Sequence, residues 1–151
     1  NKSRLGANTL LAVSLAFARA SAAQRGVPLY EHFADLIQQP LRTLPRPTIN
    51  LFSGGKHAGG QAPLQDILLV PASARTIDEA LAAAFAVYQC AAELIAHKYG
   101  MRALKADEGG LAPPFANARA MLEDAVEAIR LAGLEPGGVS RHFLHGQRSI
   151  M

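Results

Sequence analysis

Three prolines within residues 38–47 constrain the fold of this chain most, because they divide it into two parts. Proline has no backbone N–H to donate, and it disfavours the helical conformation at the residue before it. A regular helix therefore cannot run through Pro40, Pro45 and Pro47. We expect a linker or a domain boundary at this segment.

The residues before the linker have the pattern of two helices. Apolar residues and alanines fill positions 10–23, and Asn8 or Thr9 can cap the start of the first helix. Gly26 predicts its end, because glycine accepts the left-handed backbone conformation that commonly follows a helix. A shorter helix is expected over 29–37.

The residues after the linker predict the order strand, strand, helix, loop, helix. The long helix opens at Thr76 or Asp78 and ends near Gly100. Two strands make no stable sheet by themselves, and a simple α/β barrel alternates strand and helix from its first unit. We therefore expect an incomplete α/β unit that follows a helical piece. Its elements are expected at residues 48–52, 66–70, 76–99 and 117–132.

Composition and charge narrow the class of protein. Half of the residues are hydrophobic and 18% are charged, which is typical of a globular chain. The formal net charge of +3 is small and the basic residues are scattered, so we expect no nucleic-acid partner. Cys90 is the single cysteine, which excludes an internal disulfide, and we expect it to be a small buried hydrophobic residue. The apolar stretch 10–23 is interrupted by Ser14 and Arg19, so we expect no membrane span there.

A glycine-rich segment, SGGKHAGG at 53–60, separates the two expected strands. Consecutive glycines let the backbone approach a ligand closely, and Lys56 and His57 could meet an anion. The spacing matches neither a phosphate-binding Walker loop nor a dinucleotide fingerprint. A flexible turn between antiparallel strands explains the glycines equally well.

Two acidic positions also stand out. Asp66 precedes the apolar run Ile-Leu-Leu-Val, where a carboxylate needs a partner if it is buried, although an exposed residue at a strand end is the simpler interpretation. Asp107 and Glu108 are followed by two glycines, which indicates a tight and accessible loop. A carboxylate held near other negative charge is protonated more readily and can act as a general acid. An ordinary acidic turn is the alternative.

Five segments, taken together and in this order, resemble the enolase family. They are residues 1–20, 26–36, 44–60, 64–71 and 105–113. The resemblance covers roughly residues 1–138. It implies that residues 1–40 are the closing helices of an N-terminal α+β domain, and that 41–138 open a C-terminal (β/α) barrel with strand, strand, helix, helix. Residues 139–151 are expected to be a divergent tail.

The resemblance also implies roles for individual residues. In enolases a lysine removes the C2 proton of magnesium-bound 2-phosphoglycerate, and a glutamate helps the C3 hydroxyl leave, which yields phosphoenolpyruvate. Glu108 matches this catalytic glutamate, His57 matches a substrate-binding histidine, and Asp66 stands where the family usually has a second glutamate near the substrate hydroxyl. A cytoplasmic, glycolytic, homo-oligomeric lyase that requires Mg²⁺ is therefore expected of the parent enzyme.

Three positions depart from the family pattern, and so does the C-terminal tail. Asp66 is one methylene shorter than the usual glutamate, Ser53 replaces an asparagine, and Ala106 replaces a glycine. After residue 138 the resemblance implies a barrel strand that carries a magnesium aspartate, but we expect none here, because residues 139–151 contain no aspartate and no strand-like alternation. The family's other metal ligands and its lysine base are also absent from the matched segments. We expect the chain alone to be inactive. The alternatives are a subunit completed by another chain and a non-catalytic enolase-like interaction domain.

Overall fold

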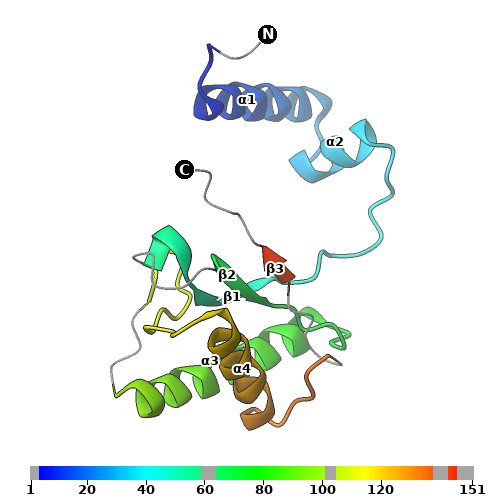
Figure 1. Cartoon of the computed structure of the whole chain (residues 1–151). Coiled ribbons are helices and arrows are strands. Elements are labelled where there is room, and N and C mark those ends of the chain that lie inside the picture. The colour runs from blue at the N-terminus through cyan, green and yellow to red at the C-terminus, as the bar shows by residue number, and fades with distance from the viewer. Residues whose placement is uncertain (1–3, 59–63, 101–104, 138–142, 146–151) are drawn as a thin grey trace. The chain divides into compact units, whose positions relative to one another are not determined.

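The computed structural model describes residues 4–58, 64–100, 105–137 and 143–145. The chain divides into two compact units, residues 1–44 and residues 45–151, and Figure 1 shows the elements of each. The division lies inside the proline-rich segment 38–47. Each unit has its own secondary structure and its own buried residues.

The first unit consists of two helices, α1 (Ala7–Arg25) and α2 (Leu29–Leu36). The expected ending of α1 is confirmed, since Gly26 has φ 67° and its N–H donates to the last carbonyls of the helix. The expected cap at Asn8 or Thr9 is wrong. The helix begins at Ala7, after Gly6, and no side chain caps it, so both residues lie in its first turn.

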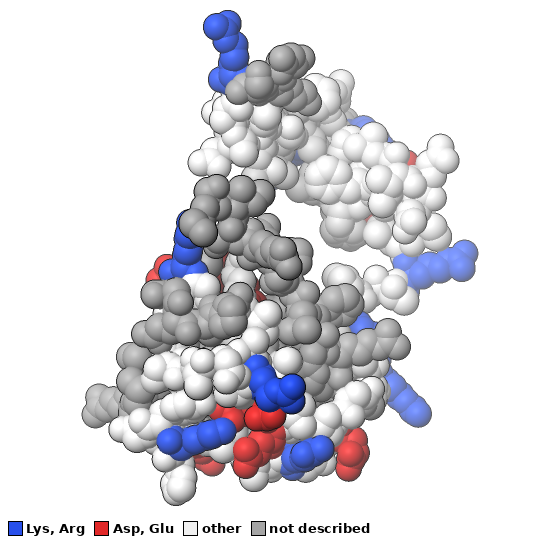
Figure 2. Space-filling model, in the orientation of Figure 1, with Lys and Arg blue, Asp and Glu red and all other residues white. Residues whose placement is uncertain are grey.

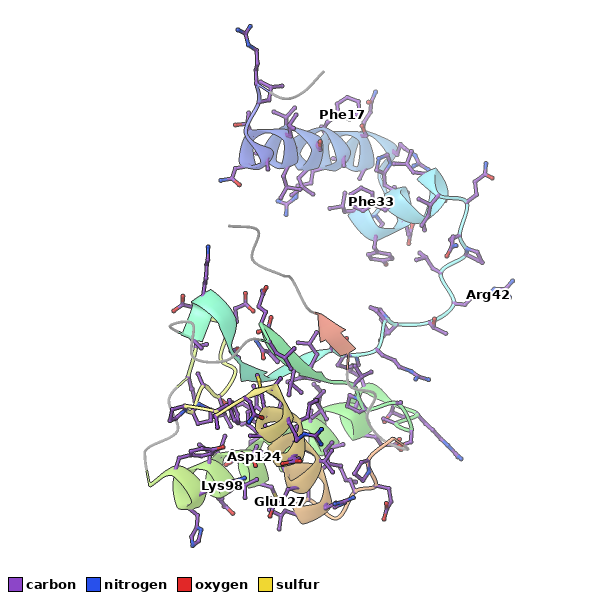
Figure 3. The ribbon with its side chains drawn as sticks, viewed as in Figure 1. Phe17, Phe33, Arg42, Lys98, Asp124 and Glu127 are labelled. Atoms are coloured by element: carbon purple, nitrogen blue, oxygen red, sulfur yellow. The ribbon has the colours of Figure 1, made fainter. Side chains whose placement is uncertain are left out.

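Small side chains and one ionic cluster join α1 to α2. Ala18, Ala22 and Ala34 are buried, whereas Phe17 and Phe33, labelled in Figure 3, are exposed. The Arg25 guanidinium pairs with the Asp35 carboxylate and lies 3.1 Å from Nδ1 of the buried His32. This cluster connects the end of α1 with α2 across the turn between them.

The second unit contains a three-stranded antiparallel sheet in the order β1–β2–β3. Its strands are β1 (Ile49–Ser53), β2 (Asp66–Leu69) and β3 (Phe143–His145), and the short 3₁₀ helix η1 (Gly55–Ala58) follows β1. The two expected strands are confirmed to within one residue. The tail supplies a short strand without an aspartate, β3, which pairs with β2 and which the lack of alternation did not indicate. Unpaired backbone groups at a strand edge accept a partner whatever its side-chain pattern, so alternation was a poor guide.

A one-residue irregularity in β1 sets which side chains share a face of the sheet. Asn50 is opposite Leu68 and Phe52 is opposite Ile67, so Leu51 has no partner residue on β2. Such an extra residue is a β-bulge, which shifts every later residue to the other face. As a result Phe52 and Ile67 face the core together, and both are fully buried.

The helices α3 (Ile77–Tyr99) and α4 (Ala118–Leu131) lie together on one face of this sheet (Figure 1). Their starts follow the sequence, since the side chain of Thr76 accepts a hydrogen bond from the N–H of Glu79 and that of Asn117 accepts one from Ala120. Such caps satisfy backbone donors that no helical carbonyl can reach. The expected positions of both helices are therefore confirmed.

A polar contact holds α3 against α4, as the labelled residues in Figure 3 show. The fully buried Asp124 accepts a hydrogen bond from the hydroxyl of Tyr99 at 2.8 Å and pairs with the ammonium of Lys98. Burial, reinforced by the bond to Asp124, raises the pKa of Tyr99 to about 12. The bond to Asp124 also raises the pKa of Lys98. The buried carboxylate is thus paired, as it must be to remain charged.

Packing accounts for part of the apolar composition of α3. Among the described residues this helix alone is long and apolar enough to cross a membrane by length and composition. Its buried side chains recur at a spacing of three or four residues, which is the pattern of a helix packed on a core. They are Ala80, Ala84, Val87, Ala91 and Ile95. Cys90 is only half-buried, so the expectation of a buried cysteine is met in part.

Candidate functional site

The end of β1 brings together two segments that the sequence singles out, the region of Asp66 and the acidic loop. The backbone N–H of Ser53 donates to the carbonyl of Leu111 at 2.9 Å, and the N–H of Leu111 donates to the carbonyl of Leu51 at 2.9 Å. These bonds place residues 105–111, here called the acid loop, beside β1. Ser53 is also the register partner of Asp66, so it lies between the loop and β2.

Asp66 is held by two side chains from β1. The amide Nδ2 of Asn50 donates to Asp66 Oδ1 at 3.1 Å and to Ser53 Oγ at 2.9 Å, and Ser53 Oγ donates to Asp66 Oδ1 at 3.3 Å. We call these three residues the Asp66 cluster. Ser53 is buried and Asp66 is half-buried, so the interpretation of Asp66 as an exposed strand-end residue is wrong.

The acid loop rests directly on this cluster through Gly110. A Cβ atom built at Gly110 would lie 2.4 Å from Ser53 Oγ and 2.6 Å from Asn50 Oδ1, closer than real side-chain atoms approach. Only glycine therefore fits between the loop and the cluster. Gly109 has a different role, since its φ of 85° is favourable for glycine alone and nothing lies near its missing Cβ.

The predicted accessible loop around Glu108 is confirmed. Asp107 and Glu108 are exposed in a turn, and the N–H of Ala106 donates to the carbonyl of Gly110 at 2.8 Å to close it. The hydroxyl of Tyr88 on α3 donates to the carbonyl of Gly109 at 2.8 Å. The loop is thus anchored on both sides, and a ligand can reach the carboxylate of Glu108.

His57 is the third residue that the sequence singles out. Its backbone lies in η1, directly after the glycines that follow β1, while its side chain lies outside the described part of the structure. The N–H of Gly54 donates to the carbonyl of Gln65 at 2.6 Å, so the start of the glycine-rich segment is tied to β2. The two strands are antiparallel, as the turn interpretation requires, and Lys56 beside His57 is exposed.

The described side chains near Asp66 do not make a magnesium centre. Among the described residues no three His, Cys, Asp or Glu side chains lie close enough together to hold a metal ion. Magnesium prefers six oxygen ligands in near-octahedral geometry. Asp66 instead has an amide and a hydroxyl as neighbours, and both donate hydrogen bonds to it. The arrangement positions a carboxylate rather than a metal.

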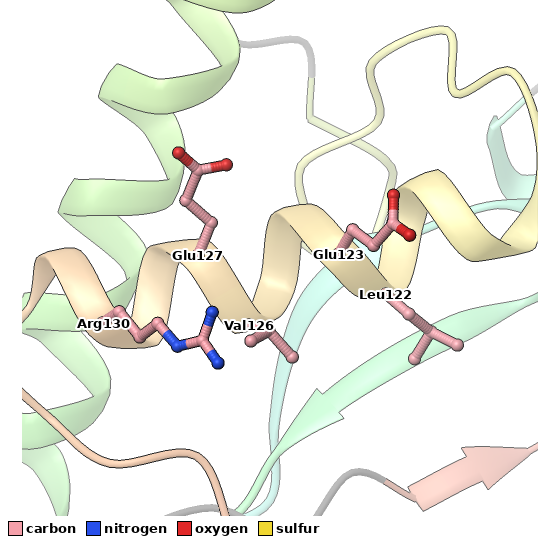
Figure 4. A pocket seen from close by; sticks show the side chains of 5 residues that line it. All are labelled: Leu122, Glu123, Val126, Glu127 and Arg130. Carbon is pink, nitrogen blue, oxygen red and sulfur yellow. The ribbon is translucent and has the colours of Figure 1, made fainter.

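A groove of about 540 Å³ lies elsewhere, on the surface of α4, and Figure 4 shows the five side chains that line it. They are Leu122, Glu123, Val126, Glu127 and Arg130. None of them belongs to the Asp66 cluster or the acid loop. On the face visible in Figure 2, acidic and basic side chains of the second unit are interspersed rather than gathered by sign. The groove therefore contains none of the site residues that the sequence predicts.

Sequence reasoning missed Asn50 and the function of Gly110. In an unbroken strand Asn50 and Ser53, three residues apart, would point to opposite faces. The bulge at Leu51 brings them to the same face, so no alternation pattern could have paired them. The available signal was the polar residue itself, an asparagine between the apolar residues Ile49 and Leu51.

Comparison with known proteins gives two matches to family models. Residues 41–141 match the model described as "Enolase, C-terminal TIM barrel domain", and residues 1–33 match "Enolase, N-terminal domain". Among individual proteins, the chain is 45% identical over 138 residues to the enolase of Eimeria tenella. It is 42% identical to enolase 1 of Entamoeba histolytica over 134 residues and 42% identical to the enolase of Methanocaldococcus jannaschii over 136 residues.

These alignments cover the chain and its relatives unequally. They include 88–89% of this chain but 31% of each relative. The chain therefore spans about a third of the length of the proteins it matches. The match to the barrel model includes the Asp66 cluster and the acid loop.

Proposed function

On the premise that the chain belongs to the enolase family, we propose that it carries the acid half of an enolase active site. The activity of the whole enzyme would be the Mg²⁺-dependent dehydration of 2-phosphoglycerate to phosphoenolpyruvate, a hydro-lyase step of glycolysis. The observation that carries the proposal is the fit of Gly110 against Asn50 and Ser53. This fit places the loop of Glu108 on the cluster that holds Asp66.

In this proposal Glu108 is the general acid. Hydroxide is a poor leaving group, so the C3–O bond breaks more easily when an acid protonates the oxygen and water departs. Glu108 is exposed at the tip of an anchored loop, which suits proton transfer to a bound ligand. Asp66 would accept a hydrogen bond from the substrate hydroxyl, and His57 would bind the substrate.

The remaining parts of the reaction lie outside these three residues. The electron pair that expels the hydroxyl comes from the C2–H bond, whose proton goes to a base that the described residues do not provide. The described residues also provide no magnesium site. We therefore assign no step of this chain to the metal, and we propose that the chain alone does not turn over. We also propose a cytoplasmic, homo-oligomeric parent enzyme.

Ligand binding is the direct test of this assignment. Titration of the ¹⁵N-labelled chain with 2-phosphoglycerate should shift the amide signals of 53–57, Asp66 and 107–110. Glu123, exposed on α4, provides a control region whose signals should stay in place. Shifts confined to α4, or no shift at millimolar ligand, would refute the proposal.

Complementation then tests the chemistry. The chain is mixed with a polypeptide that carries the remaining two thirds of the Methanocaldococcus jannaschii enolase, and formation of phosphoenolpyruvate is followed by its absorbance. The substitution Glu108→Gln should lower any rate by about 10²–10⁴-fold, the contribution typical of a general acid. Asp107→Asn, a change of the same kind at the neighbouring residue, should leave most of the rate. Equal rates in both variants would exclude Glu108 as the acid.

Exposed apolar side chains favour one second candidate, association with another polypeptide. Ile77, Leu81 and Phe85 recur every four residues on α3 and are 42–66% exposed. The chain could thus be a subunit completed by a second chain or a non-catalytic interaction domain. A cooperative thermal transition of the chain alone, together with no gain of activity on complementation, would favour the interaction domain.

A further inference from the structure

Asn50 and Ser53 each donate a hydrogen bond to the same oxygen of Asp66. The amide nitrogen of Asn50 has two hydrogens, and they are used on Ser53 Oγ and Asp66 Oδ1. The hydroxyl of Ser53 has one hydrogen, and Asp66 Oδ1 accepts it. Within the described part of the chain Asp66 Oδ2 has no such donor, so this oxygen remains available to a ligand.

The same two side chains support the acid loop. Gly110 lies against Ser53 Oγ and Asn50 Oδ1, two residues after Glu108. Asn50 Oδ1 is buried and has no hydrogen-bond partner among the described residues, so it faces the glycine rather than water. A movement of Asn50 or Ser53 would therefore displace both Asp66 and the loop of Glu108.

We propose that Asn50 and Ser53 are positioning residues that fix the side-chain rotamer of Asp66 and, through Gly110, the placement of the acid loop relative to it. An aspartate has one fewer side-chain torsion than a glutamate, so two donors on one oxygen suffice to define its orientation. The consequence for 2-phosphoglycerate rests on the proposed function. The fixed rotamer does not, and it is measured without ligand.

The test measures the χ1 torsion of Asp66 in the full chain. Three-bond couplings from Cγ to the backbone N and C′ distinguish a single rotamer from an average. We expect one rotamer in the parent chain and an average in the Asn50→Ala/Ser53→Ala double variant. Ser53→Thr keeps the hydroxyl and should preserve the rotamer on an Asn50 background. Ser73→Ala, the same change at an exposed serine, is the matched control and should have no effect.

The outcomes separate a positioning role from a packing role. Ser53→Ala removes a single oxygen, so the core signals of α3 and α4 should remain even if the double variant unfolds. Ser53→Ala alone should already broaden the rotamer distribution of Asp66. The inference is overturned if the χ1 rotamer of Asp66 is averaged in the parent chain. It is also overturned if Asp66 keeps one rotamer in every folded variant.

Ligand titration keeps this inference distinct from the proposed function. If 2-phosphoglycerate binds at the cluster, the Asn50→Ala/Ser53→Ala variant should bind it about tenfold more weakly, the effect of losing roughly one net hydrogen bond. A rotamer fixed by Asn50 and Ser53 in a chain that ignores 2-phosphoglycerate supports the positioning network and refutes only the proposed function. Binding with a disordered Asp66 refutes the network and leaves the proposed function in place.

Discussion

Replacing Gly110 by alanine is the sharpest test of how the acid loop is held. The added methyl group would lie 2.4 Å from Ser53 Oγ, 2.6 Å from Asn50 Oδ1 and 2.9 Å from Asn50 Cγ. Ordinary carbon contacts are at about 3.5–4.0 Å, so the side chains or the loop must move by an ångström or more. Both neighbours also hold Asp66, and their movement therefore breaks hydrogen bonds as well as packing.

The size of the effect follows from these two contributions. Overpacking a close-packed site destabilises a protein by about 1–3 kcal/mol, and each lost hydrogen bond adds about 1 kcal/mol. We expect Gly110→Ala to lower the free energy of unfolding by about 3 kcal/mol. Gly109→Ala is the matched control, because its φ of 85° is strained for alanine but nothing lies within 4 Å of the added atom. It should lower the free energy by about 1–2 kcal/mol.

Urea denaturation followed by far-ultraviolet circular dichroism measures both variants. The midpoint should fall further for Gly110→Ala than for Gly109→Ala. Ser53→Gly removes the atom nearest to the new methyl group, so it should recover part of the loss when combined with Gly110→Ala. An unchanged midpoint for Gly110→Ala, or an equal fall at both glycines, would refute the close contact between the loop and β1.

Three further predictions concern the helices. Asp124→Ala should lower the free energy of unfolding by about 2–3 kcal/mol in urea denaturation, because it removes a buried acceptor from Tyr99 and Lys98; an effect no larger than that of the exposed Glu123→Ala would contradict this. Stability should fall between about pH 10 and pH 12, because the pKa of Tyr99 is raised to about 12 in the folded chain from its ordinary value of 10.0, and the folded state therefore binds more protons in that window. Tyr99→Phe should flatten this fall in a series of denaturation curves at increasing pH; an unchanged slope would count against it. Asn117→Ala should cost about 1 kcal/mol through loss of the cap of α4, and Asn117→Ser should restore it by the same assay.

The ends of the helices were predictable because their signals are local. Thr76 and Asn117 precede helical patterns and do cap them, and Gly26 and Gly100 end helices in the left-handed conformation. The cap expected at Asn8 or Thr9 was wrong, since helix α1 begins at Ala7, after Gly6, without any side-chain cap. Local chemistry thus sets where a helix can end but does not exclude a start that uses no cap.

Contacts between distant segments were less accessible from the sequence. The resemblance singled out Asp66 and Glu108, yet it did not indicate that Asn50 holds the first of them. That contact depends on a bulge, which follows from how β1 packs against β2 and Leu111 rather than from local propensity. The strand β3 was missed for a related reason, because pairing along an open strand edge is decided by backbone groups.

The bulge at Leu51 also has a meaning for insertions and deletions. Because of the extra residue, an even-numbered position before the bulge and an odd-numbered position after it face the same side of the sheet, as Asn50 and Ser53 do. Deleting Leu51 would leave Asn50 and Ser53 two positions apart in a regular strand, so both would still face Asp66. A strand that kept Leu51 but lost the bulge would instead turn Asn50 away from Ser53, so the bulge itself is part of the site.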